Sequence, residues 1–216
     1  MKKLLSSAGG LSLIMHYIKH LNRDKELKKL IKQHGEMKLQ KRNRIYLHLC
    51  SSIMSQQLST KVARVFHKRF MDLYNGKDPS LQEILDTPFE TLRGIGLSNA
   101  KAAYVHNICR FFMEEKLEDG QLHKMSNEEL IALLTKIKGV GRWTVEMILM
   151  FTLGREDVFA IDDLGLRQAV VGLYGIKTKS KNKLRKEILR TSEQWAPYRT
   201  YACMYLWRWK DNVPDE

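Results

Sequence analysis

The chain has 216 residues and a formal net charge of +13, and these two numbers already restrict what it can be. The length suffices for a buried core without disulfide bonds, in one large domain or in two smaller ones that share a cleft. Lys and Arg are spread through segments with helical apolar spacing, which excludes a disordered basic tail and favours folded helices that contact a polyanion, most commonly nucleic acid. A merely basic soluble protein remains the alternative at this point.

The three cysteines, Cys50, Cys109 and Cys203, are far apart and odd in number. Such spacing gives no disulfide framework and is typical of buried thiols in a reducing compartment. No apolar run approaches the roughly 18 residues that suggest a membrane span, and the basic start is not followed by the apolar region of a signal peptide. We therefore expect no membrane contact and a cytoplasmic, nucleoid-associated protein, or a nuclear one if the source is eukaryotic.

Apolar residues recur at helical spacing, and only 4 Pro and 13 Gly interrupt them, which predicts an all-α fold. Ser80 and Ser98 stand where N-caps are expected, Pro88 is typical of a helix start, and Ser126 with Glu129 has the form of a capping box. Besides the short helix after Pro88, helices are expected at about 11–21, 24–33, 44–55, 60–74, 81–86, 99–113, 127–136 and 142–153.

Two glycines one residue apart, Gly139 and Gly141, separate the last two of these helices. Glycine gives the backbone freedom and close approach that such a turn needs. The N–H groups at the start of the second helix carry partial positive charge, so they form a seat for a phosphate, flanked here by Lys138 and Arg142. Such a seat binds the backbone of DNA without reading its sequence. An ordinary turn between helices is the alternative interpretation.

Two adjacent acidic residues, Asp162 and Asp163, stand at the start of the next helical segment. Taken alone, they are typical of helix N-terminal acids, which the helix dipole and free N–H groups stabilise. Their position shortly after the glycine hairpin favours a second interpretation, because it matches a pattern of a known enzyme family.

The segment Ile137-Lys138-Gly139-Val140-Gly141-Arg142-Trp143-Thr144-Val145 resembles the helix-hairpin-helix element of the DNA glycosylase superfamily. The glycines and Thr144 match the family pattern, whereas Ile137, Lys138 and Val145 depart from it. The Asp-Asp pair is similar to that of the 3-methyladenine DNA glycosylase II branch. The resemblance extends over about 40–210 and includes Trp195-Ala196-Pro197-Tyr198-Arg199-Thr200-Tyr201-Ala202, in which Pro197 suits the first turn of a last helix.

The resemblance implies two helical subdomains that flank a DNA-binding, base-accepting cleft. The terminal subdomain would combine residues 1–40 with the C-terminal helices of 161–216. The central subdomain would span 41–160 and carry the helix-hairpin-helix at 127–153.

The implied activity is that of a monofunctional DNA glycosylase, which hydrolyses the N-glycosidic bond of alkylated purines of the 3-methyladenine and 7-methylguanine type in base excision repair. Asp163 would be the catalytic carboxylate, since the reaction develops positive charge on the deoxyribose. Asp162 would be a helix cap or an orienting partner, and the exchanged roles are the alternative. Trp143 occupies the place of the lysine of strand-cleaving members, so no lyase activity is expected.

A glycosylase flips its target nucleotide out of the duplex, which requires a pocket for the base and a side chain that fills the gap. The resemblance assigns the base pocket to Trp143, Met147, Trp207 and Asp162, with core packing as the alternative for each Trp. Gln57 or Leu58 would be the wedge, Leu97 a wedge into the opposite strand, and Lys101 would lie near phosphate. The implied DNA-binding residues are Gln57, Leu58, Leu97, Lys101, Lys138, Gly139, Val140, Gly141, Arg142 and Thr144.

The resemblance further implies a structural Na⁺ or K⁺ ion, held by the backbone carbonyls of Thr135, Ile137 and Val140. No cofactor is expected to be required, and the four-cysteine signature of an iron–sulfur cluster is missing. The expected partner of this monomer is double-stranded DNA with damaged bases. Two rival functions remain: a non-catalytic helix-hairpin-helix DNA-binding module, and a glycosylase for deaminated bases such as uracil or hypoxanthine.

Overall fold

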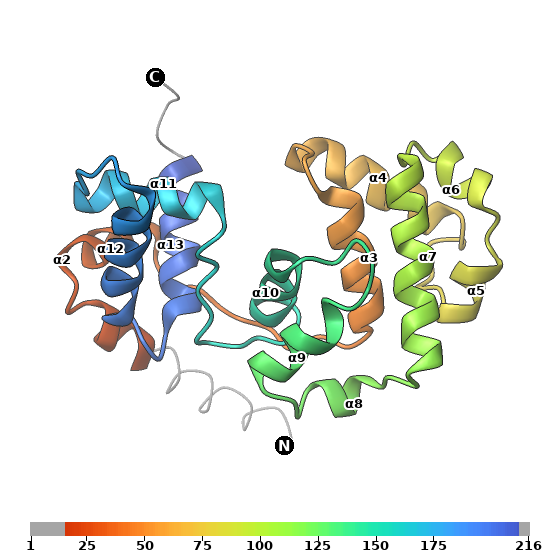
Figure 1. The fold of residues 1–216 in the computed structure, drawn as a ribbon, viewed down its shortest axis with the longest axis horizontal. Coiled ribbons are helices and arrows are strands. Elements are labelled where there is room, and N and C mark those ends of the chain that lie inside the picture. Colours follow the sequence, from red (N-terminus) through yellow and green to blue (C-terminus); the bar gives the residue numbers. More distant parts are fainter. Residues whose placement is uncertain (1–15, 212–216) are drawn as a thin grey trace, which may run out of the picture. The chain divides into compact units, whose positions relative to one another are not determined.

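The computed structural model describes residues 16–211, which form helices joined by loops and contain no strand, as predicted. The chain divides into two compact units (Figure 1): residues 1–40 with 154–216 form the first, and residues 41–153 form the second. The second crossing between units therefore lies between Leu153 and Gly154, whereas the sequence placed it between 160 and 161. Of the helix expected at 11–21, residues 16–21 are helical and 11–15 lie outside the described residues.

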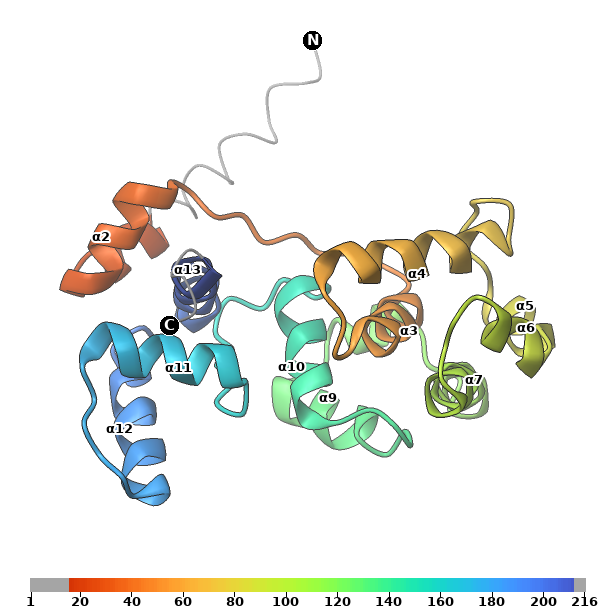
Figure 2. The same ribbon diagram turned by 90° about the horizontal axis from the view of Figure 1, so that it is seen from above.

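In the first unit, helix α13 contacts both α2 and α11, and Figure 2 looks along α13 with these two helices on either side of it. Asp24 joins the N-terminal part of this unit to the C-terminal part. One of its carboxylate oxygens accepts from the first turn of α2, and the other accepts from the Tyr174 hydroxyl at 2.8 Å and the indole N–H of the fully buried Trp195 at 3.1 Å. The unit's helices are α2 (Lys25–His34), α11 (Leu164–Tyr174), α12 (Lys181–Glu193) and α13 (Arg199–Asp211).

In the second unit, helix α7 is central, because α3, α5 and α6 all contact it. Helix α10 contacts α9 and α3, so the predicted hairpin is attached to this core. The unit's helices are α3 (Ile45–Ser55), α4 (Thr60–Asp72), α5 (Leu81–Asp86), α6 (Phe89–Gly94), α7 (Asn99–Glu114), α8 (Asp119–Leu122), α9 (Asn127–Leu134) and α10 (Arg142–Phe151).

The predicted helix starts are largely confirmed. Ser80 and Ser126 both form complete capping boxes, Ser98 accepts from the amide of Lys101, and Pro88 precedes α6. Helix α8 was not predicted, because four residues are too few to show helical periodicity.

Pro197 was placed wrongly. The last helix begins at Arg199, so Pro197 precedes its first turn.

The three cysteines are buried and form no disulfide, as predicted. Among residues 16–211, no helix combines the length and the apolar character that crossing a bilayer requires.

Candidate functional site: a hairpin and a capping carboxylate

The hairpin between α9 and α10 is a tight turn at Gly139, whose φ is 104°. The amide of Val140 donates to the carbonyl of Ile137 at 3.0 Å, which closes the turn. A Cβ at Gly139 would lie 2.2 Å from Cγ of Tyr104, so the Tyr104 ring of α7 packs directly against the hairpin backbone. The side-chain amide of Asn107, one turn further along α7, donates to the carbonyl of Lys138 at 3.3 Å.

Gly141 is the N-cap of α10 and offers no side-chain acceptor to the first turn of the helix. The N–H groups there carry the positive end of the helix dipole, as an anion seat requires. The side chain of Lys138 is exposed beside this turn, and that of Arg142 is 59% exposed while its Nε contacts the buried Glu146 at 2.9 Å. Val140 is only 4% exposed, so its side chain is not available for the predicted DNA contact.

The first unit holds Asp163 at the N-cap of α11. Its Oδ1 accepts from the amide of Leu166 at 2.7 Å and from the indole Nε1 of Trp207 at 3.0 Å. A Cβ at Gly165 would lie 3.4 Å from the same oxygen, an ordinary van der Waals contact, so this position lies directly beside the carboxylate. The two hydrogen bonds to Oδ1 fix the orientation of the Asp163 carboxylate, which is only partly buried.

The loop before Asp163 is attached to the start of α13. Arg199 donates to both carboxylate oxygens of Asp157, from Nε at 2.6 Å and from Nη2 at 2.8 Å. The Thr200 hydroxyl is fully buried; it donates to the carbonyl of Arg155 at 2.6 Å and accepts from the amide of Val158 at 3.1 Å. The Arg-Thr pair of the C-terminal motif thus positions the loop that leads to Asp163.

Asp162 has a different role from the one predicted. The helix cap is Asp163, while the carboxylate of Asp162 forms an ion pair with Arg185 at 2.6 Å, with both side chains 49% exposed. A carboxylate paired with a surface arginine is a poor element for a base pocket, so we remove Asp162 from that set.

Two residues beside the carboxylate were missed by the sequence analysis. Leu164 directly follows Asp163 and is 61% exposed, the largest exposed fraction among the large apolar side chains of the described residues. Gly165 lies directly beside the carboxylate. Neither residue carries a polar group, so no motif marked them; only their position next to Asp163 could have done so.

The predicted gap-filling loop follows α3 in the second unit. Gln57 is exposed in the left-handed conformation with φ of 59°, and Leu58 is half-buried. Leu97, in contrast, is 1% exposed, because it packs into the core of its unit. A buried side chain does not enter a base stack, so the prediction of a wedge at Leu97 was wrong.

Two further residues that were predicted to bind DNA have side chains that bond within the protein. The Lys101 ammonium is partly exposed and donates to the carbonyls of Met54 and Gln56, at 3.0 and 2.7 Å. The Thr144 side chain is 2% exposed, and its hydroxyl accepts from the side-chain amide of Gln56 at 3.2 Å, so the predicted DNA contact is left to its backbone. Both side chains are engaged in holding the loop after α3.

Trp143 and Met147 are half-buried and lie one turn apart on α10, in the second unit, whereas Trp207 and the aspartates belong to the first. Their role in a base pocket stays a prediction. Trp207 does more than pack, since its N–H donates to Asp163. Within residues 16–211, no group of His, Cys, Asp and Glu side chains is arranged to hold a metal ion.

The fold and the site together define a class: an all-helical DNA-binding protein with a helix-hairpin-helix and an oriented aspartate at a helix start. The family model described as "HhH-GPD superfamily base excision DNA repair protein" matches residues 50–195. DNA-3-methyladenine glycosylase 1 of Schizosaccharomyces pombe is 37% identical over 186 residues, which are 85% of this chain and 80% of that protein.

Two solved structures are similar over nearly the whole chain. One is the S. pombe 3-methyladenine DNA glycosylase in complex with abasic DNA, with a TM-score of 0.81, 34% identity, and coverage of 92% of this chain and 98% of that one. The other is a DNA-3-methyladenine glycosidase from Bacillus halodurans, with a TM-score of 0.77, 33% identity, and coverage of 91% and 89%. The chain belongs to the HhH-GPD superfamily and, within it, to the 3-methyladenine DNA glycosylase family.

Proposed function

We propose that this protein hydrolyses the N-glycosidic bond of alkylated purines in double-stranded DNA, with Asp163 as the catalytic carboxylate. The observation that carries the proposal is the fixed orientation of Asp163, whose Oδ1 accepts from the Leu166 amide and the Trp207 indole. The family relatives named as 3-methyladenine glycosylases support 3-methyladenine and 7-methylguanine as the substrate class. A non-catalytic DNA-binding module would need this acid only as the cap of α11, and the similarity of nearly the whole chain to proteins named as glycosylases favours the enzyme.

The hydrolysis requires few protein groups besides this carboxylate. An N-alkylated purine is cationic while it is attached to the sugar, so it leaves as a neutral base when the bond to C1′ breaks and both bonding electrons depart with it. The sugar then carries oxocarbenium-like charge, which an ionised carboxylate stabilises strongly where water is excluded. A water that adds to C1′ transfers its proton to the carboxylate or to solvent and completes the hydrolysis.

Strand cleavage is not part of the proposed reaction. The lyase route needs a neutral amine that attacks C1′ and forms an imine with the sugar. Trp143 occupies the position where a lyase would carry that amine, and an indole nitrogen is not a nucleophile of this kind. We therefore propose a monofunctional enzyme that leaves an abasic site.

The hairpin is proposed to bind the DNA backbone. The uncapped first turn of α10 presents its N–H groups to a phosphate, and the exposed Lys138 and Arg142 add positive charge. The carbonyls of Thr135, Ile137 and Val140 are hard oxygen donors of the kind that suit Na⁺ or K⁺, and Ile137 keeps one lone pair beside its bond to Val140. A bound monovalent cation would supply further positive charge to the phosphate seat.

The remaining contacts complete the proposal. Gln57 or Leu58 fills the gap left by the flipped nucleotide, and Trp143, Met147 and Trp207 offer apolar and aromatic surface to an electron-poor base. The exposed Leu164 adds an apolar contact next to Asp163. A monomer that acts in the compartment of the DNA, the cytoplasm or a nucleus, needs no further cofactor for this reaction.

The direct test is the release of free bases from two duplexes, one methylated and one carrying uracil or hypoxanthine. We expect release of 3-methyladenine and 7-methylguanine from the first, and far slower release from the second. Abasic strands should stay intact until alkali is added. Preferred release of deaminated bases would favour the rival glycosylase, and no release from either duplex would favour the non-catalytic module.

A further inference from the structure

The end of helix α3 is held by a lysine from another helix. Lys101 lies in the first turn of α7, and its ammonium donates to the carbonyls of Met54 and Gln56, at 3.0 and 2.7 Å. These carbonyls belong to the terminal turn and C-cap of α3, where carbonyl groups lack partners within the helix and a cation is favoured. Burial lowers the pKa of Lys101, in keeping with a cation drawn into this contact.

A second hydrogen bond holds the same loop from the hairpin side. The Gln56 side chain donates to the buried hydroxyl of Thr144, in the first turn of α10. The residue after Gln56 is Gln57, which is exposed and has a φ of 59°. A non-glycine residue persists in that conformation only where its surroundings impose it. The hydrogen bond to the Gln56 carbonyl and the one from its side chain both hold the residue directly before Gln57.

We propose that Lys101 is a positioning residue that fixes the loop after α3, so that Gln57 and Leu58 are presented ready to enter the base stack. The inference deepens the proposed function and rests on it. It differs from the phosphate contact first expected for Lys101, because both carbonyls compete with phosphate for the ammonium. Pre-ordering the loop lowers the cost of filling the gap when a nucleotide leaves the duplex.

The test compares Lys101→Met with Lys138→Met, which removes an exposed charge beside the hairpin. In Lys101→Met we expect base release from a fully paired methylated duplex to fall about tenfold, and a smaller loss where the lesion lies opposite a mismatched base, since flipping is then easier. The fluorescence of 2-aminopurine next to the lesion, which rises on unstacking, should increase less than with the unaltered protein. Lys101→Arg should restore both signals, because a guanidinium also donates to two carbonyls.

The salt dependence separates positioning from phosphate binding. Loss of one phosphate contact lowers the slope of log affinity against log salt by about 0.9. We expect that change in Lys138→Met and an unchanged slope in Lys101→Met. A lowered slope in Lys101→Met, or equal losses on paired and mismatched duplexes, would overturn the proposal. Should Lys101→Met fail to fold, Lys101→Gln replaces it, because it removes the charge and keeps a polar N–H donor.

Unaltered protein is assayed first, so that the two proposals can fail separately. Absence of base release by unaltered protein contradicts the proposed function. Normal release by unaltered protein, with equal release and equal 2-aminopurine signal in Lys101→Met, contradicts only the role of Lys101.

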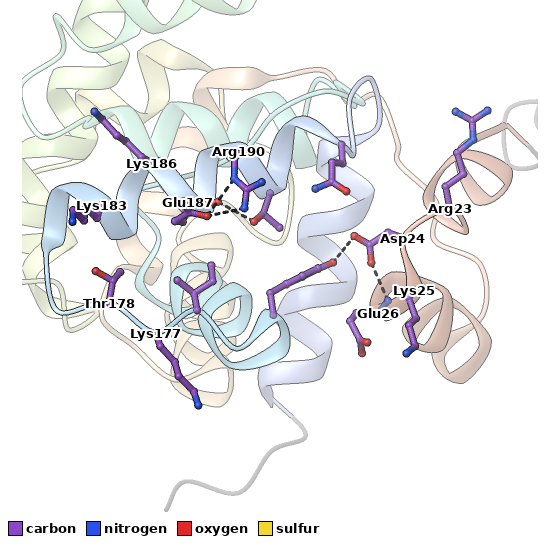
Figure 3. Close-up of a pocket in the computed structure, with 14 residues that line it drawn as sticks. Arg23, Asp24, Lys25, Glu26, Lys177, Thr178, Lys183, Lys186, Glu187 and Arg190 are labelled. Atoms are coloured by element: carbon purple, nitrogen blue, oxygen red, sulfur yellow. Dashed lines mark hydrogen bonds and ion pairs between the residues drawn. The ribbon is translucent and has the colours of Figure 1, made fainter.

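An independent observation concerns a groove in the first unit that includes neither Asp163 nor Trp207 in its lining. The groove has a volume of about 1090 Å³ and is bordered by the start of α2, the segment after α11, and α12. Figure 3 shows Lys183, Lys186 and Arg190 along α12, opposite the start of α2. Its basic lining residues are Arg23, Lys25, Lys177, Lys183, Lys186 and Arg190.

The three acidic residues of the groove are already engaged within the protein. Asp24 caps α2 and accepts from Tyr174 and Trp195, Glu26 pairs with Lys29 at 2.7 Å, and Glu187 pairs with Arg190 at 2.8 Å. Five of the six cations thus border one hollow without a carboxylate of their own there, an arrangement that a polyanion would relieve.

We infer that this groove binds a second stretch of the phosphodiester backbone of DNA, apart from the hairpin. The double variant Lys183→Glu/Lys186→Glu should lower the salt slope for a long undamaged duplex by about two units, at roughly 0.9 for each lost phosphate contact. The control Lys28→Glu/Lys32→Glu has the same change of charge on the exposed part of α2 outside the groove. Equal salt slopes in the two double variants would overturn the inference. An unchanged slope in Lys183→Glu/Lys186→Glu would also overturn it and would favour an acidic protein as the partner of the groove.

Discussion

Replacing Asp163 by asparagine should reduce base release by at least about 1,000-fold and leave DNA binding nearly unchanged. Asparagine is as good an N-cap as aspartate, and its carbonyl oxygen still accepts from the Leu166 amide and the Trp207 indole. The substitution therefore removes the negative charge that stabilises the oxocarbenium-like sugar, while the start of α11 keeps its hydrogen bonds. Single-turnover release from methylated duplex measures the first effect, and titration of an abasic duplex measures the second.

The matched control is Asp162→Asn. Asp162 is adjacent in sequence and carries the same charge, but it pairs with Arg185 at the surface. We expect less than about a threefold change in base release, since an exposed ion pair contributes little to stability or to the field at a distant reacting atom. Equal losses in both variants would mean that general charge, rather than one oriented carboxylate, supports the reaction. Undiminished release by Asp163→Asn would remove Asp163 from the mechanism.

These two aspartates also show how far the sequence could determine the site. The motif assigned the proposed catalytic role to Asp163 rather than to its neighbour by the order of residues alone. Which acid caps the helix was decided by the backbone at 160–163, where the amide of Asp163 donates to the carbonyl of Ala160. Such a turn has no simple residue signature, so from the sequence Asp162 was expected to be a helix cap or an orienting partner.

Helix starts were predictable because their signals are local. A serine followed three residues later by glutamate satisfies N–H groups within one turn, whatever the rest of the chain does, and both Ser80 and Ser126 do so. Lys101 and Leu97 were misread for the opposite reason. The carbonyls that bind Lys101 come from a different helix, and the burial of Leu97 depends on packing partners distant in sequence. In the sequence, a charged or apolar residue near these glycines looks the same whether its side chain bonds and packs within the protein or is exposed to DNA.

The two hairpin glycines should respond very differently to alanine. At Gly139 a Cβ would lie 2.2 Å from the Tyr104 ring, and φ is 104°, so Gly139→Ala should destabilise the protein by about 3 kcal/mol. The hairpin must also shift, because the ring belongs to the central helix of the unit, and DNA affinity should fall with it. At Gly141 φ is −91° and no atom lies within 4 Å of a Cβ, so Gly141→Ala should cost less than about 1 kcal/mol.

A double variant at Tyr104 and Gly139 tests whether contact with the Tyr104 ring causes the destabilisation of Gly139→Ala. If steric overlap displaces the hairpin, Tyr104→Ala should be destabilising alone yet should recover part of the loss when combined with Gly139→Ala, with a coupling of about 1–2 kcal/mol in chemical denaturation. The backbone strain at Gly139 persists in the double variant, so recovery should be incomplete. Simple additivity of the two changes would show that the ring does not hold the turn. In that case the positive φ at Gly139 alone, rather than its contact with α7, would explain why glycine is required in this turn.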